Sequence, residues 1–277
     1  MKANSTWLND TITTKRKEAG DRDKYNPFTV TLPNGTVEID IDLAKDDQLT
    51  VLVPIMTKLR EWVTCATIDD DTVAKTFQSM RLTICGSAGS GKSFFIECLA
   101  NTIRRIFQMR TAVVIAAPTG AAAYNVGGET VHRTFAVNPH KPSQRIGKSA
   151  TKRLKNDLIR TLVLIIDERS MLTTDVIGAA ERNSAATVHG GYHDSEDWGG
   201  IPIVIFVGDD FQLPPPTNRE KGAFDTMDSN SSWSQQQFNG NGAFGHQIFK
   251  AMSETCMELT TVKRQNSSQS HYKEVLQ

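Results

Sequence analysis

The chain has few of the features that mark a membrane protein, a secreted scaffold or a zinc protein. No apolar run approaches the length of a membrane span, and residues 1–20 lack the apolar stretch of a secretory signal. The four cysteines form no C-x-x-C pair, which excludes a zinc ribbon and is typical of thiols in a reducing, intracellular compartment. Basic and acidic residues number 31 each, so the net charge neither favours nor excludes a polyanionic partner.

Four short, nearly continuous apolar runs are typical of strands buried on both faces of a parallel sheet. They lie at residues 82–85, 112–117, 162–166 and 203–207. Helical patterns occur between them at 94–107, 121–126 and 149–158, and a further one begins at Gln48. The alternation of strand and helix predicts an α/β fold with a doubly wound, mainly parallel sheet.

A complete G-x-x-x-x-G-K-[ST] phosphate-binding motif joins the first apolar run to the helical pattern after it. Its glycines allow backbone N–H groups to surround a phosphate without Cβ clashes, and the following helix adds the positive end of its dipole. A flexible glycine turn is the alternative, which this placement disfavours. The predicted nucleotide-binding residues are Gly86, Ser87, Ala88, Gly89, Ser90, Gly91, Lys92 and Ser93. Lys92 is expected to reach the β- and γ-phosphates of ATP, and Ser93 to hold Mg²⁺.

Two later segments follow strands and carry candidate catalytic side chains. Asp167 and Glu168 directly follow the run at 162–166, where Asp167 is expected to hold Mg²⁺ and Glu168 to act as general base for water. An ordinary strand-ending turn is the alternative, disfavoured by the phosphate-binding motif upstream. Gln212 lies in the proline-rich segment 208–216, where it could sense the γ-phosphate or orient water, although a rigid proline turn explains the same pattern.

Taken in order, these motifs resemble those of the petite-integration-frequency (PIF) family of DNA helicases in superfamily one. The matching segments are residues 86–93, 117–123, 130–132, 166–171, 208–215 and 259–265, and the resemblance spans about residues 43 to 265. It implies a RecA-like fold, ATP and Mg²⁺ as cofactors, single-stranded or forked DNA as partner, and 5′ to 3′ movement. It also implies a role in repair, recombination or genome maintenance, in the nucleus or mitochondrion.

The resemblance also assigns roles to individual side chains. Gln48 stands where the family reads adenine, although a solvated glutamine at a helix start is the alternative. Arg264 stands where the family has an arginine near the γ-phosphate. The residues that stand at single-stranded-DNA contacts of the family are Thr119, His132 and Phe135.

The chain departs from the family pattern at three places. Arg169 replaces an apolar residue after the Asp-Glu pair, and Asp210 is an extra residue before Phe211. The chain also stops soon after Arg264, so we expect a truncated second helicase domain. The predicted organisation is a poorly ordered leader (1–36), a RecA-like ATP-binding domain (37–224), a flexible Ser/Gln/Asn/Gly-rich loop (225–245) and the start of a second domain (246–277).

A basic segment offers evidence for nucleic acid that is independent of the family. Residues 130–161 contain a single acid, Asp157, and eight basic residues: Arg133, Lys141, Arg145, Lys148, Lys152, Arg153, Lys155 and Arg160. Such a cluster in a neutral chain is a candidate phosphate track, and a solvated charged helix face is the alternative.

These patterns predict the ATP-binding part of a DNA helicase, which by itself binds ATP and hydrolyses it slowly. Movement along DNA requires a second domain that closes on ATP. Two alternatives remain open: a non-catalytic nucleotide- and DNA-binding fragment, and another P-loop enzyme such as a small-molecule kinase.

Overall fold

A computed structural model describes residues 28–32, 35–39, 46–67, 77–187, 197–209, 212, 215 and 240–260. Its main sheet has six strands, all parallel, in the order β5-β4-β6-β7-β3-β8. The strands are β3 (Met80–Cys85), β4 (Val113–Ala117), β5 (Glu129–Thr130), β6 (Val163–Ile166), β7 (Ile203–Gly208) and β8 (Cys256–Glu258). The predicted fold class, a doubly wound parallel α/β sheet, is confirmed.

The four predicted strands form the middle of this sheet as β3, β4, β6 and β7. Their register places aliphatic residues side by side: Ile115 lies opposite Ile165, which lies opposite Ile205, which lies opposite Leu82. All residues of β6 and β7 are buried. This burial on both faces explains why their sequences are continuous rather than alternating in polarity.

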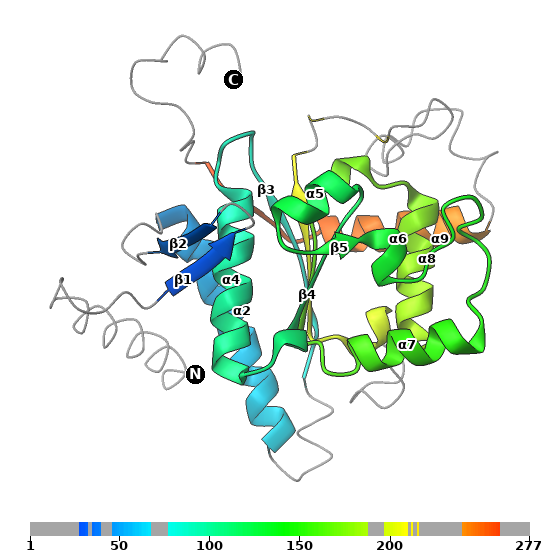
Figure 1. Ribbon diagram of the computed structural model, residues 1–277, viewed down its shortest axis with the longest axis horizontal. Coiled ribbons are helices and arrows are strands. Elements are labelled where there is room, and N and C mark those ends of the chain that lie inside the picture. Colours follow the sequence, from blue (N-terminus) through cyan, green and yellow to red (C-terminus); the bar gives the residue numbers. More distant parts are fainter. Residues whose placement is uncertain are drawn as a thin grey trace, which may run out of the picture.

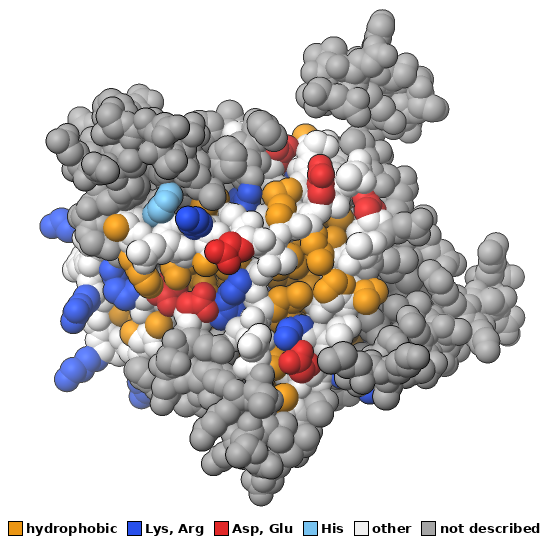
Figure 2. Space-filling view, turned by 180° about the vertical axis from the view of Figure 1, so that it is seen from behind, with side chains coloured by type: hydrophobic (Ala, Val, Ile, Leu, Met, Phe, Trp, Pro, Cys, Tyr) orange, Lys and Arg blue, Asp and Glu red, His pale blue; other side chains and the backbone are white. Residues whose placement is uncertain are grey.

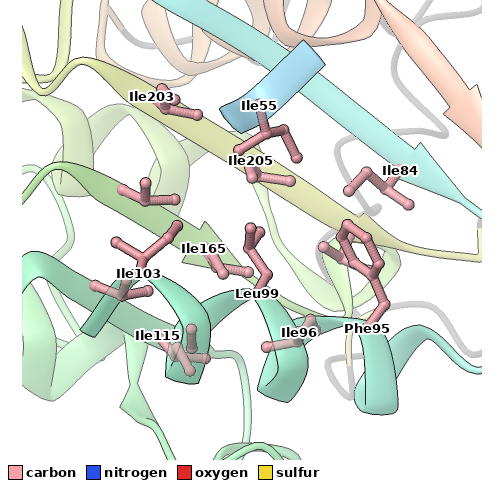
Figure 3. Close-up of a cluster of buried hydrophobic side chains, with 14 of the residues drawn as sticks. Ile55, Ile84, Phe95, Ile96, Leu99, Ile103, Ile115, Ile165, Ile203 and Ile205 are labelled. Atoms are coloured by element: carbon pink, nitrogen blue, oxygen red, sulfur yellow. The ribbon is translucent and has the colours of Figure 1, made fainter. Parts of the chain in front are cut away.

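Helices α2 (Asp46–Thr67) and α4 (Lys92–Phe107) cover one face of the sheet (Figure 1). In α4 the buried positions recur at helical spacing, and they face Ile55 of α2 and the isoleucines of the strands (Figure 3). The buried apolar residues of α4 in this core are Phe95, Ile96, Leu99, Ala100 and Ile103. Fully burying a large aliphatic side chain contributes about 1.5–3 kcal/mol to the free energy of unfolding. The buried side chains of α4 therefore fix this helix against the sheet, directly after the loop that precedes it.

The opposite face is covered by α6 (Val131–Thr134), α7 (Lys148–Leu158), α8 (Thr174–Ala185) and α9 (Gly240–Ser253) (Figure 1). Aromatic rings pack edge to face beneath these helices: the ring of Trp198 lies 6.0 Å from that of Phe135 and 6.0 Å from that of Phe206. Trp198 belongs to the short helix η4 (Asp197–Gly200), and its side chain is fully buried. This core therefore joins segments that are distant in the sequence.

The predicted helices at 94–107, 121–126 and 149–158 are confirmed as α4, α5 (Gly120–Asn125) and α7, each starting within two residues of the expected position. The helical pattern from Gln48 is confirmed as α2. Helix α8 was not predicted. Within the described ranges, no helix is both long and apolar enough to cross a membrane.

The last part of the leader predicted at residues 1–36, expected to be poorly ordered, contains a strand and the start of a second one. Strand β1 (Phe28–Leu32) pairs antiparallel with β2 (Gly35–Ile39), and the two lie beside α4 in Figure 1. The sequence contains a missed hairpin signal, because Phe28, Val30 and Leu32 alternate with threonines before an Asn-Gly pair. Apolar and acidic residues also alternate at 37–43, a strand pattern that overlaps β2; residues 40–43 lie outside the described part.

The predicted boundary between a loop ending at 245 and a second domain starting at 246 is also corrected. Helix α9 begins at Gly240 and packs on α8, and β8 pairs with β3 of the main sheet. A Cβ at Gly245 would collide with the backbone carbonyl of Thr174, so glycine there allows the two helices to touch. Residues 240–260 thus pack with the main sheet and with α8, while 225–239 and 261–277 lie outside the described residues.

Candidate nucleotide site at the carboxyl edge of the sheet

The phosphate-binding motif forms the turn between β3 and α4. Gly89 and Gly91 have φ values of 86° and 88°, in the left-handed region that residues with a Cβ avoid. The N–H of Ser90 donates to the carbonyl of Ser87 (3.1 Å), and that of Phe95 donates to the carbonyl of Gly91 (2.9 Å), where α4 begins. The two glycines therefore let the chain turn tightly into the helix, with its N-terminus at the loop.

Gly86 is the point at which three strands converge on the loop. Its N–H donates to the carbonyl of Gly208, at the end of β7 (3.3 Å). A Cβ at Gly86 would collide with Ser90 Oγ and would lie 2.9 Å from the carbonyl oxygen of Leu259, just after β8. Only a residue without a side chain fits here, which explains the first glycine of the motif.

Lys92 is folded back onto this loop. Its Nζ donates to the carbonyl oxygens of Gly86 (2.6 Å) and Ser87 (3.1 Å), and its side chain is 9% exposed. The ammonium group is thus held inside the turn by the loop's own backbone. Ser93, in the first turn of α4, is exposed.

Ser90 is a second polar side chain held inside the loop. It is 1% exposed, and its Oγ has no hydrogen-bond partner within the described structure. A buried hydroxyl without a partner costs about 1–3 kcal/mol. The loop therefore contains a polar atom that a bound polar ligand could satisfy.

Asp167 follows β6 at the same edge of the sheet and is 4% exposed. Its N–H donates to the carbonyl of Ala116 in β4 (2.9 Å). Burial is the main cause that raises the pKa of its carboxyl to about 6, and the charge of Glu168 raises this pKa further. The backbone N–H of Glu168 and the charge of Lys92 lower it. The charge of Lys92 thus acts on the Asp167 carboxyl, and the two residues lie at the same edge of the sheet.

Glu168 has an unusual backbone conformation. Its φ of 52° and ψ of 49° are left-handed, although it is not a glycine, and it directly precedes the short helix η3 (Arg169–Met171). Its side chain is half-buried. Residues held in sparsely populated backbone regions cluster at functional sites, and this geometry is compatible with a carboxylate that must have one fixed direction.

Arg169, the departure from the family pattern, connects β3 with α9. It is 4% exposed and donates to Thr83 Oγ1 (3.0 Å) and Ser253 Oγ (3.4 Å), and its guanidinium lies 5.2 Å from the centre of the Phe249 ring. Gly208 leaves room for it, because a Cβ there would lie 3.0 Å from Arg169 Cγ. The arginine therefore forms a buried polar link behind the site.

The remaining residues predicted to contact the nucleotide are only partly described. Gln48 is 3% exposed in the first turn of α2, so the alternative of a solvated glutamine is wrong. Gln212 is half-buried, and its N–H donates to the carbonyl of Asp209 (3.1 Å) in a turn. Arg264 lies outside the described residues. The roles assigned to these three side chains stay predictions.

Two of the predicted DNA contacts lie at short helices beyond β4 and β5. Thr119 Oγ1 accepts a hydrogen bond from the N–H of Ala122 (3.2 Å) and caps α5. His132 lies on α6, and burial lowers the pKa of its imidazole. Neither observation tests contact with DNA.

Phe135 cannot stack on a base in this structure. Its side chain is 0% exposed and packs against Trp198, so it is corrected from a DNA contact to a core residue. No local pattern indicates this burial, because the partner ring, Trp198, is distant along the chain. The aromatic ring that the structure exposes nearby in sequence is Tyr124 of α5, at 62%, which the sequence analysis did not select.

All eight basic residues of the segment 130–161 are exposed. Arg153, on α7, donates to the carbonyl of Arg133 on α6 (3.2 Å). Because α7 ends at Leu158, shortly before β6 starts at Val163, its end lies near the amino edge of the sheet, opposite the phosphate-binding loop. Figure 2, seen from behind, shows several Lys and Arg side chains along its left edge. The end of α7 is therefore separate from the nucleotide site.

Comparison with protein families gives a match over most of the described fold. A family model described as PIF1-like helicase matches residues 64–240. The ATP-dependent DNA helicase PIF1 of Emericella nidulans is 34% identical over 134 residues, which is 47% of this chain and 17% of that protein. The ATP-dependent DNA helicase Pif1 of Psychrobacter sp. is 35% identical over 160 residues, or 55% of this chain and 23% of that protein.

Solved structures give the same result. Pif1 helicase from Bacteroides in complex with ADP-AlF3 and ssDNA has a TM-score of 0.51 and 25% identity, over 81% of this chain and 44% of that one. A structure of two coordinating Pif1 helicases at forked dsDNA has a TM-score of 0.53 and 27% identity, over 80% of this chain and 45% of that one. The chain thus spans less than a quarter of the two curated relatives and less than half of these solved chains.

Proposed function

Because the chain belongs to the PIF1-like helicase family, we propose that it is the ATP-binding part of an ATP-dependent DNA helicase. The observation that carries this proposal is the juxtaposition of Lys92 and Asp167 beside a glycine loop at the carboxyl edge of a parallel sheet. Ligands of open α/β sheets bind at that edge. The neighbour crystallised with ADP-AlF3 and ssDNA supports both ligand classes.

In this proposal the phosphates of ATP bind to the N–H groups of residues 86–93. The left-handed glycines and the partnerless hydroxyl of Ser90 fit an anion cradle. When ATP binds, the ammonium group of Lys92 donates to phosphate oxygens in place of the carbonyls of Gly86 and Ser87. Because these carbonyls belong to the loop itself, the ammonium group is already close to the phosphate position before ATP binds. Gln48, buried at the start of α2, reads the adenine base.

Ser93 and Asp167 are the side chains that would hold Mg²⁺. In the described part of the chain, no group of three or more His, Cys, Asp or Glu side chains could hold a metal ion. Two protein oxygens suit Mg²⁺, which usually keeps several waters and binds substrate phosphates. When bound, the ion neutralises charge that develops on the phosphates.

For hydrolysis, Glu168 accepts a proton from the attacking water at its carboxylate, while Asp167 stays ionised beside Lys92. Gln212 orients that water, and Arg264 interacts with the γ-phosphate; both roles rest on the family resemblance. The chain described here is expected to turn over slowly, because an arginine supplied by a second domain contributes roughly 10³ to 10⁵ in rate where one acts.

We assign single-stranded or forked DNA to the surface near Thr119 and His132. The structure withdraws Phe135 from this surface, and the exposed ring of Tyr124 replaces it as a stacking face. Stacking of a base on an aromatic side chain contributes about 1–3 kcal/mol. Three further properties are proposed from the family resemblance alone. They are movement from 5′ to 3′ along DNA, a role in repair or recombination, and a location in the nucleus or mitochondrion.

The Tyr124 assignment is tested by the fluorescence anisotropy of a labelled single strand. Tyr124→Ala is expected to weaken binding roughly fivefold or more, since one stacked base is lost. Phe244→Ala is the matched control, because Phe244 is an exposed ring, at 36%, on α9. Equal affinities of the Tyr124 variant and the unchanged chain would remove this ring from the DNA surface.

The proposed function is tested by ATP hydrolysis with and without single-stranded DNA. The chain is expected to hydrolyse ATP slowly and faster with DNA, whereas Glu168→Gln should keep nucleotide binding and lose turnover. Binding without any turnover in the unchanged chain would favour the non-catalytic alternative. Turnover that DNA does not stimulate would favour another P-loop enzyme.

A further inference from the structure

Two cysteines that the ATP site does not use lie against each other at its edge. Cys85 Sγ and Cys256 Sγ are 3.1 Å apart, and neither is in a disulfide. Cys85 is the last residue of β3 and precedes the phosphate-binding loop, whereas Cys256 starts β8. The fold thus brings together two thiols that are 171 positions apart in sequence.

The sheet register explains why the sulfur atoms meet. Cys256 lies opposite Thr83, and Cys85 lies opposite Glu258, in the parallel pair β3–β8. Residues two apart on a strand point to the same face, so Cys85 and Cys256 are diagonal neighbours on one side of the sheet. A disulfide bond is roughly 1 Å shorter than the present contact, so a small shift of side chains and edge strand would close it.

The surroundings favour reaction of this pair. Cys256 is exposed, so a small molecule can reach it, and Cys85 is half-buried. The guanidinium of Arg169 donates to Cys85 Sγ at 3.7 Å. The thiolate is the nucleophilic form of cysteine in disulfide exchange. The pair therefore combines an accessible thiol with a second thiol next to a positive charge.

We propose that Cys85 and Cys256 form a dithiol modification site that low-molecular-weight disulfides oxidise to an intrachain disulfide. The Cys256 thiolate attacks one sulfur of the small disulfide, which forms a mixed disulfide and releases one small thiol. The Cys85 thiolate then attacks Cys256 Sγ and releases the second small thiol. The protein dithiol is oxidised, the small disulfide is reduced to two thiols, and the two cysteine protons end on those thiols.

Oxidation at this position acts on the phosphate-binding loop. The carbonyl of Cys85 accepts from the N–H of Leu259 (2.8 Å), and the next residue, Gly86, carries the carbonyl that holds Lys92. Gly86 is closely surrounded, because even a Cβ there would collide with Ser90 Oγ and crowd the carbonyl oxygen of Leu259. Drawing β8 and β3 together at the two sulfurs therefore disturbs the cradle, and nucleotide affinity is expected to fall severalfold. This consequence rests on the proposed function.

The cross-link is tested by incubating the full chain with oxidised glutathione, blocking remaining thiols and mapping peptides by mass spectrometry. A Cys85–Cys256 peptide pair is expected, and dithiothreitol should reverse it. Cys256→Ser should give no intrachain link, whereas Cys98→Ser, a change on α4, should still form it. Glutathione adducts without the link, or persistent free thiols at both positions, would overturn the proposal.

The coupling to the loop is tested by titrating a fluorescent ATP analogue into the reduced and the oxidised chain. Oxidation should weaken binding severalfold, dithiothreitol should restore it, and Cys256→Ser should be insensitive to the oxidant. Equal affinity of the cross-linked and reduced forms would overturn the coupling. If the reduced chain binds no nucleotide, the proposed function fails, and the peptide mapping still decides whether the dithiol site exists.

Discussion

The face of the sheet covered by α2 and α4 packs mainly aliphatic side chains, whereas the face covered by α6 to α9 contains four buried aromatic rings and several buried polar groups. The first face supports the helix that begins at the phosphate-binding loop. The second joins segments from residue 131 to residue 252. A continuous layer of apolar side chains thus stabilises the face behind the phosphate-binding loop, whereas specific contacts between distant segments stabilise the opposite face.

The largest expected effect is on the aliphatic face. Leu99→Ala removes a side chain that is 1% exposed between α4 and the sheet, and it should lower the free energy of unfolding by about 2–5 kcal/mol. Ile106→Ala, on the same helix but 50% exposed, is the control and should change stability by less than about 0.5 kcal/mol. Chemical denaturation measures both. Similar losses for the two variants would contradict a stabilising layer of buried side chains.

On the other face, the contact between α8 and α9 depends on glycine. Gly245→Ala places a Cβ against the backbone of Thr174 and Gly178, so the helices must separate, at a cost of about 1–3 kcal/mol. Gly120→Ala, at the start of α5 with no atom within 4 Å of the added Cβ, should be neutral or slightly stabilising. Thermal melts of both variants compare them. An unchanged melting temperature for Gly245→Ala would show that α9 does not pack as described.

A smaller, pH-dependent effect is expected at Glu97 on α4. Burial raises the pKa of this carboxyl from 4.5 to about 7, so the folded state holds a proton that the unfolded state has lost between these values. Its contribution to stability is therefore present below pH 4.5 and is lost as the pH rises through 7. Glu97→Gln should raise stability by roughly 1 kcal/mol at pH 8, after allowance for partial exposure, and little at pH 4.5. Equal effects at both pH values would contradict this.

The contrast between the faces also explains which elements the sequence predicted. Strands β3, β4, β6 and β7 and helix α4 have local apolar patterns that need no partner to be recognised. Helix α8 was missed because its buried side chains are partly polar. Asn183 Nδ2 donates to the carbonyl of Phe135 (3.0 Å), Ser184 Oγ donates to the carbonyl of Trp198 (3.1 Å), and Glu181 accepts from the N–H of Trp198 (3.0 Å). A pattern of apolar residues along the sequence does not reveal these hydrogen-bond partners, because they are distant in the chain.

The candidate site follows the same rule. Residues 86–93, Asp167 and Glu168 were found because each lies in a contiguous motif directly after a strand. Burial of Phe135 and exposure of Tyr124 depend on how distant segments pack, so no local pattern separates a core ring from a surface ring. The meeting of Cys85 with Cys256 likewise follows from the addition of β8 beside β3, a pairing that sequence spacing does not reveal.

The most direct test of the central claim is the affinity of the chain for ATP with Mg²⁺, measured by titration calorimetry for three proteins. Lys92→Ala should weaken binding at least about tenfold relative to the unchanged chain, because it removes the ammonium held inside the loop. Lys155→Ala, an exposed lysine on α7, should bind as the unchanged chain does. Equal affinities for all three proteins would contradict a nucleotide site at this loop.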